Sequence, residues 1–208
     1  LSLLLLLGIS SSAEEATKET REKLEPLAQW GQWRGPLATG EAPLGDPPIE
    51  WSEEKNIRWK TVLPGSGHST PVVWGDQVFL LSAVAHGEKL KVPEQPPGAH
   101  NNLDAEKMTK FVVVALSRQT GKIIWEKVVR NAQPHQSAHE SGTWASASPV
   151  TDGERVYAFF GSNGLHCLST SGKLLWEKDF GDMQVKHGHG EGASPALHDE
   201  TLVLNWDH

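Results

Sequence analysis

Short apolar runs, each ended by a turn signal, follow one another through the second half of the chain. Glycine-containing turns suited to tight hairpins lie at 152–153, 162–164 and 170–172. Proline and glycine interrupt the pattern too often for a helical repeat. The pattern therefore predicts four antiparallel strands, at 148–151, 155–161, 164–168 and 173–180.

The same arrangement occurs more than once. A block of a small residue, a proline and apolar residues, then a tight turn and a second apolar run, begins at Ser69, Ala147 and Ala193. The second run, as at 78–81, is apolar without alternation, which is typical of a strand buried on both faces. Four strands per ~40–50 residues is the size of a propeller blade. We therefore expect an all-β fold, a β-propeller of four-stranded antiparallel blades at roughly 60–83 with 110–129, 146–180 and 192–207.

A second block follows the first two copies and identifies the kind of propeller. Residues Ala115, Thr120, Gly121, Lys122 and Trp125 match the pattern Ala-x-Asp-x-x-Thr-Gly-Lys-x-x-Trp, with Ser117 in place of the aspartate, and Gly172, Lys173 and Trp176 repeat its end. This pattern resembles the tryptophan-docking motif of the quinoprotein (pyrroloquinoline quinone-like) propeller family. The resemblance runs from Trp33 to His208 and implies an exported bacterial member of which this chain is the N-terminal part, an incomplete arc of about three and a half blades.

The docking motif makes a structural prediction. Glycine adopts the turn conformation, and the tryptophan packs its large face on the adjacent blade. Gly121, Trp125, Gly172 and Trp176 are therefore expected to be structural residues, with both tryptophans largely buried between neighbouring blades. The motif does not predict cofactor binding, because non-catalytic propellers share it.

The first residues resemble an export signal. Residues 1–13 form an apolar stretch that ends in small residues before Glu14, as in a signal peptide whose start is missing. The stretch is too short to span a bilayer. We expect cleavage near Ala13 and a periplasmic or extracellular protein. Residues 14–50 would form a charged leader and a Gly/Pro-rich arm, and 51–208 the propeller.

Charge and cysteine content exclude two classes of protein. The net charge of −7 argues against a nucleic-acid groove. A single cysteine, Cys167, excludes an internal disulfide framework and is expected to be a small core residue.

Polar residues gather on one predicted face. In an antiparallel meander, the connections between blades and the loop between the second and third strands share one end, here named the top face. Eight of the ten histidines fall there, including His68, His139, His187 and His189. With Trp144 and Glu191 these four are candidates for ligand binding, and the two histidines of 187–189 with Glu191 could also ligate a transition metal. Asn205 and Asp207 have the oxygen chemistry of a calcium site.

Two functions fit this pattern. The first is an exported binding or scaffold propeller whose partner is an envelope protein, a polysaccharide or a small molecule. The alternative is an alcohol or sugar oxidoreductase that uses pyrroloquinoline quinone with calcium. Catalytic residues are not assigned. The loop additions favour the first function, since a repeat specifies a fold and not a site.

Overall fold

The computed structural model describes residue 20 and residues 24–207. Strands make up 35% of the structure and helix 6%, the latter mostly as short 3-10 turns. No helix within the described residues is long and apolar enough to cross a membrane. The strands are β1 (Val72–Trp74), β2 (Gln77–His86), β3 (Asn102–Leu103), β4 (Met108–Ser117), β5 (Ile123–Ala132), β6 (Ala138–His139), β7 (Val150–Thr151), β8 (Arg155–Phe159), β9 (Leu165–Ser169), β10 (Leu174–Lys178), β11 (Ala196–His198) and β12 (Thr201–Val203). The 3-10 turns are η1 (Pro26–Ala28), η2 (Gly161–Asn163) and η3 (Lys186–Gly188).

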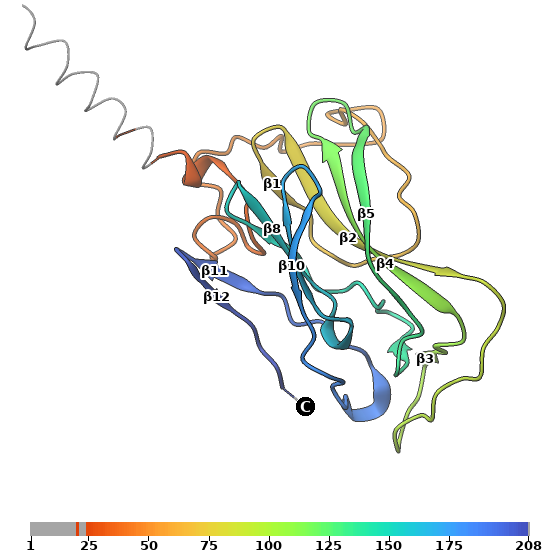
Figure 1. The fold of residues 1–208 in the computed structure, drawn as a ribbon. Helices are drawn as coiled ribbons and strands as arrows, with labels where there is room; N and C mark the ends of the chain where they lie inside the picture. The colour runs from red at the N-terminus through yellow and green to blue at the C-terminus, as the bar shows by residue number, and fades with distance from the viewer. Residues whose placement is uncertain (1–19, 21–23, 208) are drawn as a thin grey trace, which may run out of the picture.

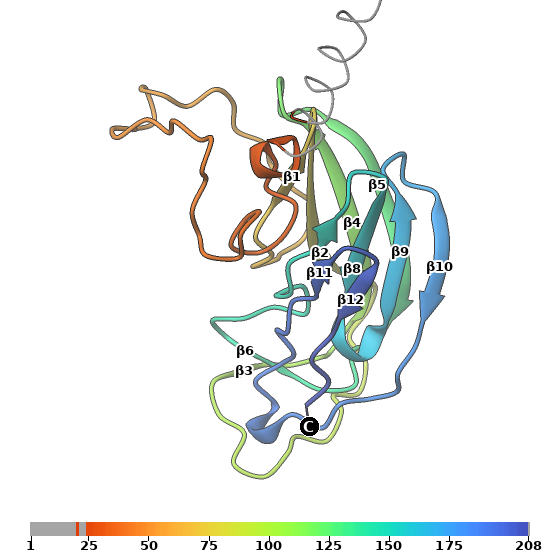
Figure 2. The ribbon, with the colours of Figure 1, turned by 90° about the vertical axis from the view of Figure 1, so that its left-hand side faces the viewer.

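The strands form successive antiparallel meanders. Two sheets have four strands each, in the orders β1-β2-β4-β5 and β7-β8-β9-β10, and β11 with β12 forms a further pair. Figures 1 and 2 show these sheets side by side, as in consecutive blades of a propeller, without closure into a ring. The all-β prediction and the incomplete propeller arc are confirmed. The short pair of β3 and β6 lies outside the blades and joins two of the loops.

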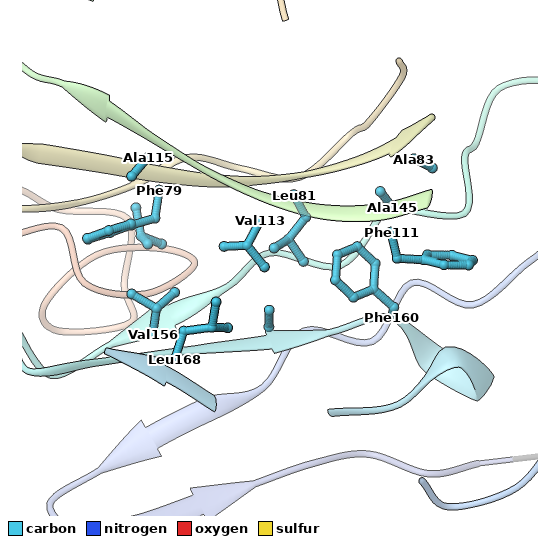
Figure 3. Close-up of a cluster of buried hydrophobic side chains, with 12 residues drawn as sticks. Phe79, Leu81, Ala83, Phe111, Val113, Ala115, Ala145, Val156, Phe160 and Leu168 are labelled. Carbon is cyan, nitrogen blue, oxygen red and sulfur yellow. The ribbon is translucent and has the colours of Figure 1, made fainter. Parts of the chain in front are cut away.

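The core lies between the first two four-stranded sheets. Buried residues of β2 and β4 face buried residues of β8 and β9 across this interface, as Figure 3 shows. The rings of Phe111 and Phe160 meet edge to face at 5.3 Å. Neighbouring residues of β2 and β4, such as Val78 and Val114, are buried on the opposite face of the same sheet. The unbroken apolar runs in the sequence thus reflect strands that are buried on both faces.

The repeated proline block links each blade to the next. Thr70, Ser148 and Ser194 each precede the proline of their own copy. The backbone N–H of Thr70 donates to the hydroxyl of Ser148 at 2.9 Å, and the N–H of Ser148 donates to the hydroxyl of Ser194 at 2.9 Å. The hydroxyl of one blade therefore satisfies the backbone of the blade before it. This explains why the block has a hydroxyl residue at that position.

These two hydrogen bonds from a backbone N–H to the hydroxyl of the next blade, here named the hydroxyl ladder, give a first testable prediction. Replacing Ser148 with alanine removes the acceptor for Thr70 N–H and leaves that donor without its partner beside a buried position. We expect the free energy of unfolding to fall by about 1–3 kcal/mol. Urea denaturation measures the change. Ser171→Ala, an exposed hydroxyl in the hairpin before β10, is the control and should change stability by less than about 0.5 kcal/mol. Equal effects of the two substitutions would contradict the ladder.

The docking tryptophans behave differently from one blade to the next. Trp125 Nε1 donates to Thr170 O of the next blade at 2.9 Å, and a Cβ on Gly172 would lie 2.8 Å from the indole. Trp59 makes the equivalent contact with the first blade, donating to Arg118 O at 2.9 Å. Gly121 gives that indole the same close approach. These contacts agree with the structural role expected for Trp125, Gly121 and Gly172.

The expectation that Trp176 is largely buried is wrong. Its side chain is 44% exposed, and its ring contact is with Tyr157 of its own blade. The third sheet contributes only β11 and β12 within the described residues, so the hairpin that would receive this indole is not among them. Cys167, by contrast, is buried as expected, and burial raises the pKa of its thiol to about 11.

The segment after η1 crosses one end of the inner strands. Trp30 pairs with Val73 of β1 through two backbone hydrogen bonds, and Gly31 O accepts from Thr151 N of β7 at 2.8 Å. A Cβ on Gly31 would lie 2.7 Å from that Thr151 carbonyl, so a larger residue does not fit there. Within the predicted leader and arm of residues 14–50, residues 36–48 consist of turns and mostly exposed coil. The proposed signal peptide, residues 1–13, lies outside the described residues.

Candidate functional site

Long connections gather at the end of the molecule opposite η1. Residues 87–107 join β2 to β4, residues 133–149 join β5 to β7, and residues 179–195 join β10 to β11. Figures 1 and 2 both place these three segments at the same end, which also holds the end of the described chain. We name them together the loop surface. It corresponds to the top face predicted from the alternating direction of the strands.

Specific hydrogen bonds hold the three loops together. Strands β3 and β6 pair the first loop with the second, with Asn102 opposite His139. The Asn102 amide donates to Ser137 Oγ at 2.9 Å and to His187 O at 2.8 Å, so it bonds to both other loops at once. His139 N–H donates to His189 O at 3.1 Å. The loop surface is therefore one joined structure built from three blade connections.

Four imidazoles meet where these loops join. His189 lies at the centre, with ring centroids 4.8 Å from His100, 4.9 Å from His139 and 5.7 Å from His187. The His100 and His187 rings are also 5.7 Å apart. Burial lowers the pKa of His189, and charge on the three neighbouring imidazoles lowers it further. The neutral form is therefore favoured, and neutral imidazole is the form that binds metals.

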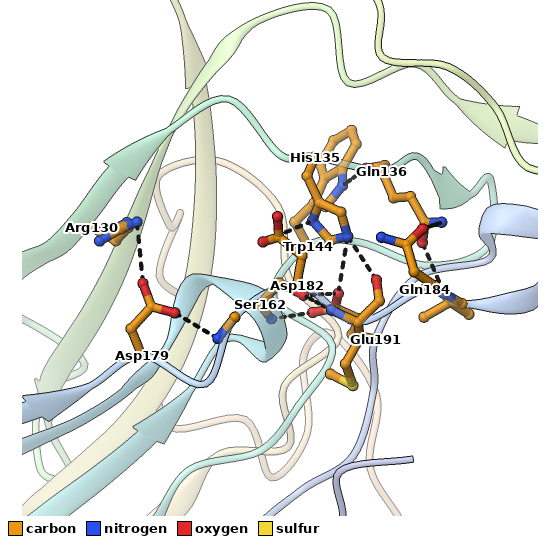
Figure 4. Close-up of polar contacts among 12 residues, drawn as sticks. Arg130, His135, Gln136, Trp144, Ser162, Asp179, Asp182, Gln184 and Glu191 are labelled. Atoms are coloured by element: carbon orange, nitrogen blue, oxygen red, sulfur yellow. Dashed lines mark hydrogen bonds and ion pairs between the residues drawn. The ribbon is translucent and has the colours of Figure 1, made fainter. Parts of the chain in front are cut away.

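Glu191 occupies a different part of the loop surface, shown in Figure 4. Its side chain is only 13% exposed. The carboxylate accepts from the backbone N–H and the hydroxyl of Ser162, both at 2.5 Å, and lies 3.9 Å from His135 Nε2. The Ser162 hydroxyl accepts in turn from Met183 N at 2.7 Å. Glu191 thus ties its loop to η2 of the second blade.

The pKa of Glu191 follows from this setting. Burial raises it above the ordinary value, while the two hydrogen bonds from Ser162 act in the opposite direction. Burial is the larger effect because the carboxylate gives up most of its hydration. Glu191 is therefore a buried acid held by local donors.

The remaining candidates lie apart from the four imidazoles. His68 is exposed, and its backbone N–H donates to Ala145 O at 3.1 Å. Trp144 packs on the core between the blades and donates from Nε1 to Gln136 O at 3.0 Å. Asn205 and Asp207 are exposed beyond β12, and the calcium site suggested for them stays a prediction. Among the described residues, no group of three or more His, Cys, Asp or Glu side chains could hold a metal ion.

Sequence reasoning linked His139, His187 and His189 but left out three residues that organise the loop surface. His100 and Asn102 belong to the polar loops of the predicted top face but are not candidates for ligand binding, and Ser162 is not a candidate either. The spacing of two histidines around Gly188 revealed part of the cluster. Nothing local in the sequence connects residue 100 with residue 189, because the contact depends on how the loops of two blades cross.

Comparison with known families agrees with the fold. A family model described as outer membrane protein assembly factor BamB, a pyrroloquinoline quinone-like repeat, matches residues 82–205. The chain belongs to the pyrroloquinoline quinone-like repeat family. No curated protein matches it. The family assignment covers most of both complete four-stranded sheets and the β11–β12 pair, so it rests on the same repeats that build the blades.

The quinone after which the repeat family is named does not fit the enclosed recess of the loop surface. The recess beside Trp144 measures about 20 Å³, room for about one water molecule, and Glu191 lines it. Pyrroloquinoline quinone is a planar tricarboxylate, so a binding site would need both a larger space and cationic partners. No lysine or arginine lines this recess. We derive no catalytic step through the quinone.

Proposed function

We propose that this protein is an exported binding or scaffold propeller of the cell envelope, and that it binds its partner through the loop surface. The main observation in support is that three long connections between strands are joined into one polar surface, while the hairpins at the other end are short. Loops positioned by a rigid scaffold commonly carry binding residues. The family description, an outer membrane assembly factor, supports an envelope protein as the first partner class.

The shape of the loop surface favours a large partner. Small-molecule sites are usually concave pockets of about 300–1,000 Å³ that enclose the ligand. The enclosed recess on this surface is about 20 Å³. A second hollow, beside Asn102 and Trp144, has a volume of about 500 Å³ but is more open, so it would enclose a small ligand less completely. A protein or polysaccharide instead contacts a broad surface with scattered polar groups. A small molecule and the quinone are therefore the less favoured ligands.

Site-specific photo-crosslinking in the native cell tests the proposal. Glu140 is exposed on the loop surface, and Glu154 is a matched exposed glutamate in the hairpin between β7 and β8 at the other end. A photoreactive residue at 140 is expected to capture a defined envelope protein, and one at 154 is not. Equal capture from both positions, or none from 140, would count against the loop surface as the binding face.

The same preparation tests export and the alternative function. N-terminal sequencing should find the mature chain beginning near residue 14, in the envelope or extracellular fraction. A retained residue 1–13 segment in the cytosol would contradict export. Calorimetry with pyrroloquinoline quinone and calcium should show no saturable binding. Saturable quinone binding that weakens in His187→Ala would replace the scaffold proposal with the oxidoreductase.

A further inference from the structure

Binding of a partner does not by itself require the four imidazole rings that meet where the three connections of the loop surface join. These rings belong to His100, His139, His187 and His189, with His189 at the centre. The rings of His100 and His139 stand at 81° and 70° to the ring of His189, an edge-to-face packing that suits neutral aromatic rings. Imidazole gains its charge below about pH 6.5, so the cluster is placed to respond to mild acid.

The hydrogen bonds of His139 require its neutral form. The backbone N–H of Ser141 donates to His139 Nδ1 at 3.2 Å, and the Ser141 hydroxyl lies 2.7 Å from the same nitrogen. Nδ1 therefore carries a lone pair, and the proton of the neutral ring is on Nε2. In the imidazolium form both nitrogens carry protons, and Nδ1 can no longer accept. Protonation of His139 thus breaks its bond with the Ser141 backbone.

The two rings of the β10–β11 connection have no acceptor for an additional proton. His187 Nδ1 and His189 Nε2 are buried, and neither has a hydrogen-bond partner within the described part of the chain. In a neutral ring such a nitrogen can keep an unshared lone pair. In the imidazolium form it becomes a charged, buried N–H without an acceptor, which costs far more free energy. The closed arrangement therefore disfavours protonation of both rings.

The electrostatic setting of His189 acts in the same direction. Burial lowers its pKa, and charge on the imidazoles of His100, His139 and His187 lowers it further. These three rings belong to the β2–β4, β5–β7 and β10–β11 connections, the segments that meet at His189. A second positive charge in the cluster is therefore placed within about 5 Å of the first, where the two repel.

Carboxylates do not offset this repulsion at the described residues around His189, since none contributes to the shift of its pKa. Glu191, two residues further on, bonds to Ser162 instead. Glu140 and Lys186, each next in sequence to a ring of the cluster, have exposed side chains. The cluster is thus an unusual group of imidazoles that stays joined only while its members are uncharged.

We propose that these four histidines form a pH-sensitive latch, which holds the three connections together while the rings are neutral and releases them when the rings are protonated. Protonation of histidine clusters at about pH 5–6 is an established way to switch protein interfaces. The contacts to be released are the bond from His139 N–H to His189 O at 3.1 Å and the bond from the Asn102 amide to His187 O at 2.8 Å. The blades themselves keep their own strand pairing.

Acid favours the open form because the closed form lowers the pKa of His189. A histidine released to water has an ordinary pKa of about 6.5, so the open form binds protons at a higher pH than the closed form does. The closed form is fully favoured above about pH 6.5 and is lost as the pH falls through the closed-state pKa. A partner bound through the loop surface, as proposed above, would then dissociate in mild acid.

Hydrogen exchange of the intact chain, measured by NMR at about pH 7.5 and about pH 5.5, tests the latch. After correction for the intrinsic exchange rate, the protection of His139 N–H should fall at least ~10-fold in acid, because its acceptor is His189 O. Ser117 N–H donates to Lys122 O at 2.8 Å in the hairpin between β4 and β5, away from the loop surface. Its protection should change by less than ~3-fold, since local opening leaves other regions closed.

His189→Gln removes the central titrating ring and keeps a polar side chain. In this variant the protection of His139 N–H should fall less in acid, and the protection of Ser117 N–H shows that the blades are folded. His198→Gln is the matched control, since this histidine of β11 is 93% exposed and lies outside the cluster. It should respond to acid like the unmodified protein.

Three results would overturn the latch. These are unchanged protection of His139 N–H in acid, an equal fall at Ser117, and a full acid response in the folded His189→Gln protein. The measurement needs no partner, so it can fail while the crosslinking result at residue 140 stands, and the reverse also holds.

Discussion

Replacing Trp125 with alanine is expected to lower the free energy of unfolding by about 3–5 kcal/mol, the usual range for deleting a large packed aromatic side chain. The indole packs on the core between the blades, its ring centroid is 6.0 Å from that of Phe79, and its Nε1 donates to Thr170 O. The substitution removes packing and leaves a space over Gly172, where the absence of a Cβ lets the indole approach the backbone.

Trp176 provides the matched control within the repeat. It occupies the equivalent position of the next docking motif but is 44% exposed. Trp176→Ala in this 208-residue chain should therefore change the free energy of unfolding by about 1 kcal/mol, within the ordinary range for single substitutions. Guanidinium denaturation of both variants measures the difference. Similar losses at the two positions would show that docking onto the next blade is not what makes Trp125 important.

This comparison also shows how far the fold could be predicted from sequence. The turns at 152–153, 162–164 and 170–172 and the apolar runs between them predicted the strands β7 to β10 to within a few residues. Turn chemistry and apolar periodicity are local, so the sequence carries them directly. The prediction that Trp176 is buried failed because its burial depends on contact with a neighbouring blade. The motif itself carries no information about that contact.

The loop surface was predictable only in part. The direction of antiparallel strands fixes which loops share an end, and this brought His139, His187 and His189 to one face. The way in which the loops cross there is set by individual bonds, such as those of the Asn102 amide. Such bonds leave no periodic signal. For this reason Glu191, expected beside the histidines in a ligand site, instead bonds to Ser162.

The bonds of Glu191 lead to the second large effect. Glu191→Ala removes the acceptor of two hydrogen bonds from Ser162 and the anion beside His135. Because Ser162 is itself buried, its backbone N–H would lose its partner away from water. We expect a loss of about 2–4 kcal/mol in the free energy of unfolding. Glu191→Gln keeps a carbonyl oxygen for Ser162 N–H, so its loss should be about 1 kcal/mol.

Comparing the pH dependence of stability in the unmodified protein and in Glu191→Gln separates the effect of the carboxylate charge from that of its shape. The pKa of Glu191 is raised in the folded protein above its ordinary value of 4.5, so the folded state holds this proton to a higher pH than the unfolded state does. The stability contributed by Glu191 is therefore fully present below about pH 4.5 and falls as the pH rises through the folded-state pKa. Glutamine does not titrate. Urea unfolding at a series of pH values should thus show the unmodified protein losing stability relative to Glu191→Gln as the pH rises above about 4.5. A relative gain over that range would mean that the ionised carboxylate is favoured by the fold, and that the donors of Ser162 outweigh the cost of its burial.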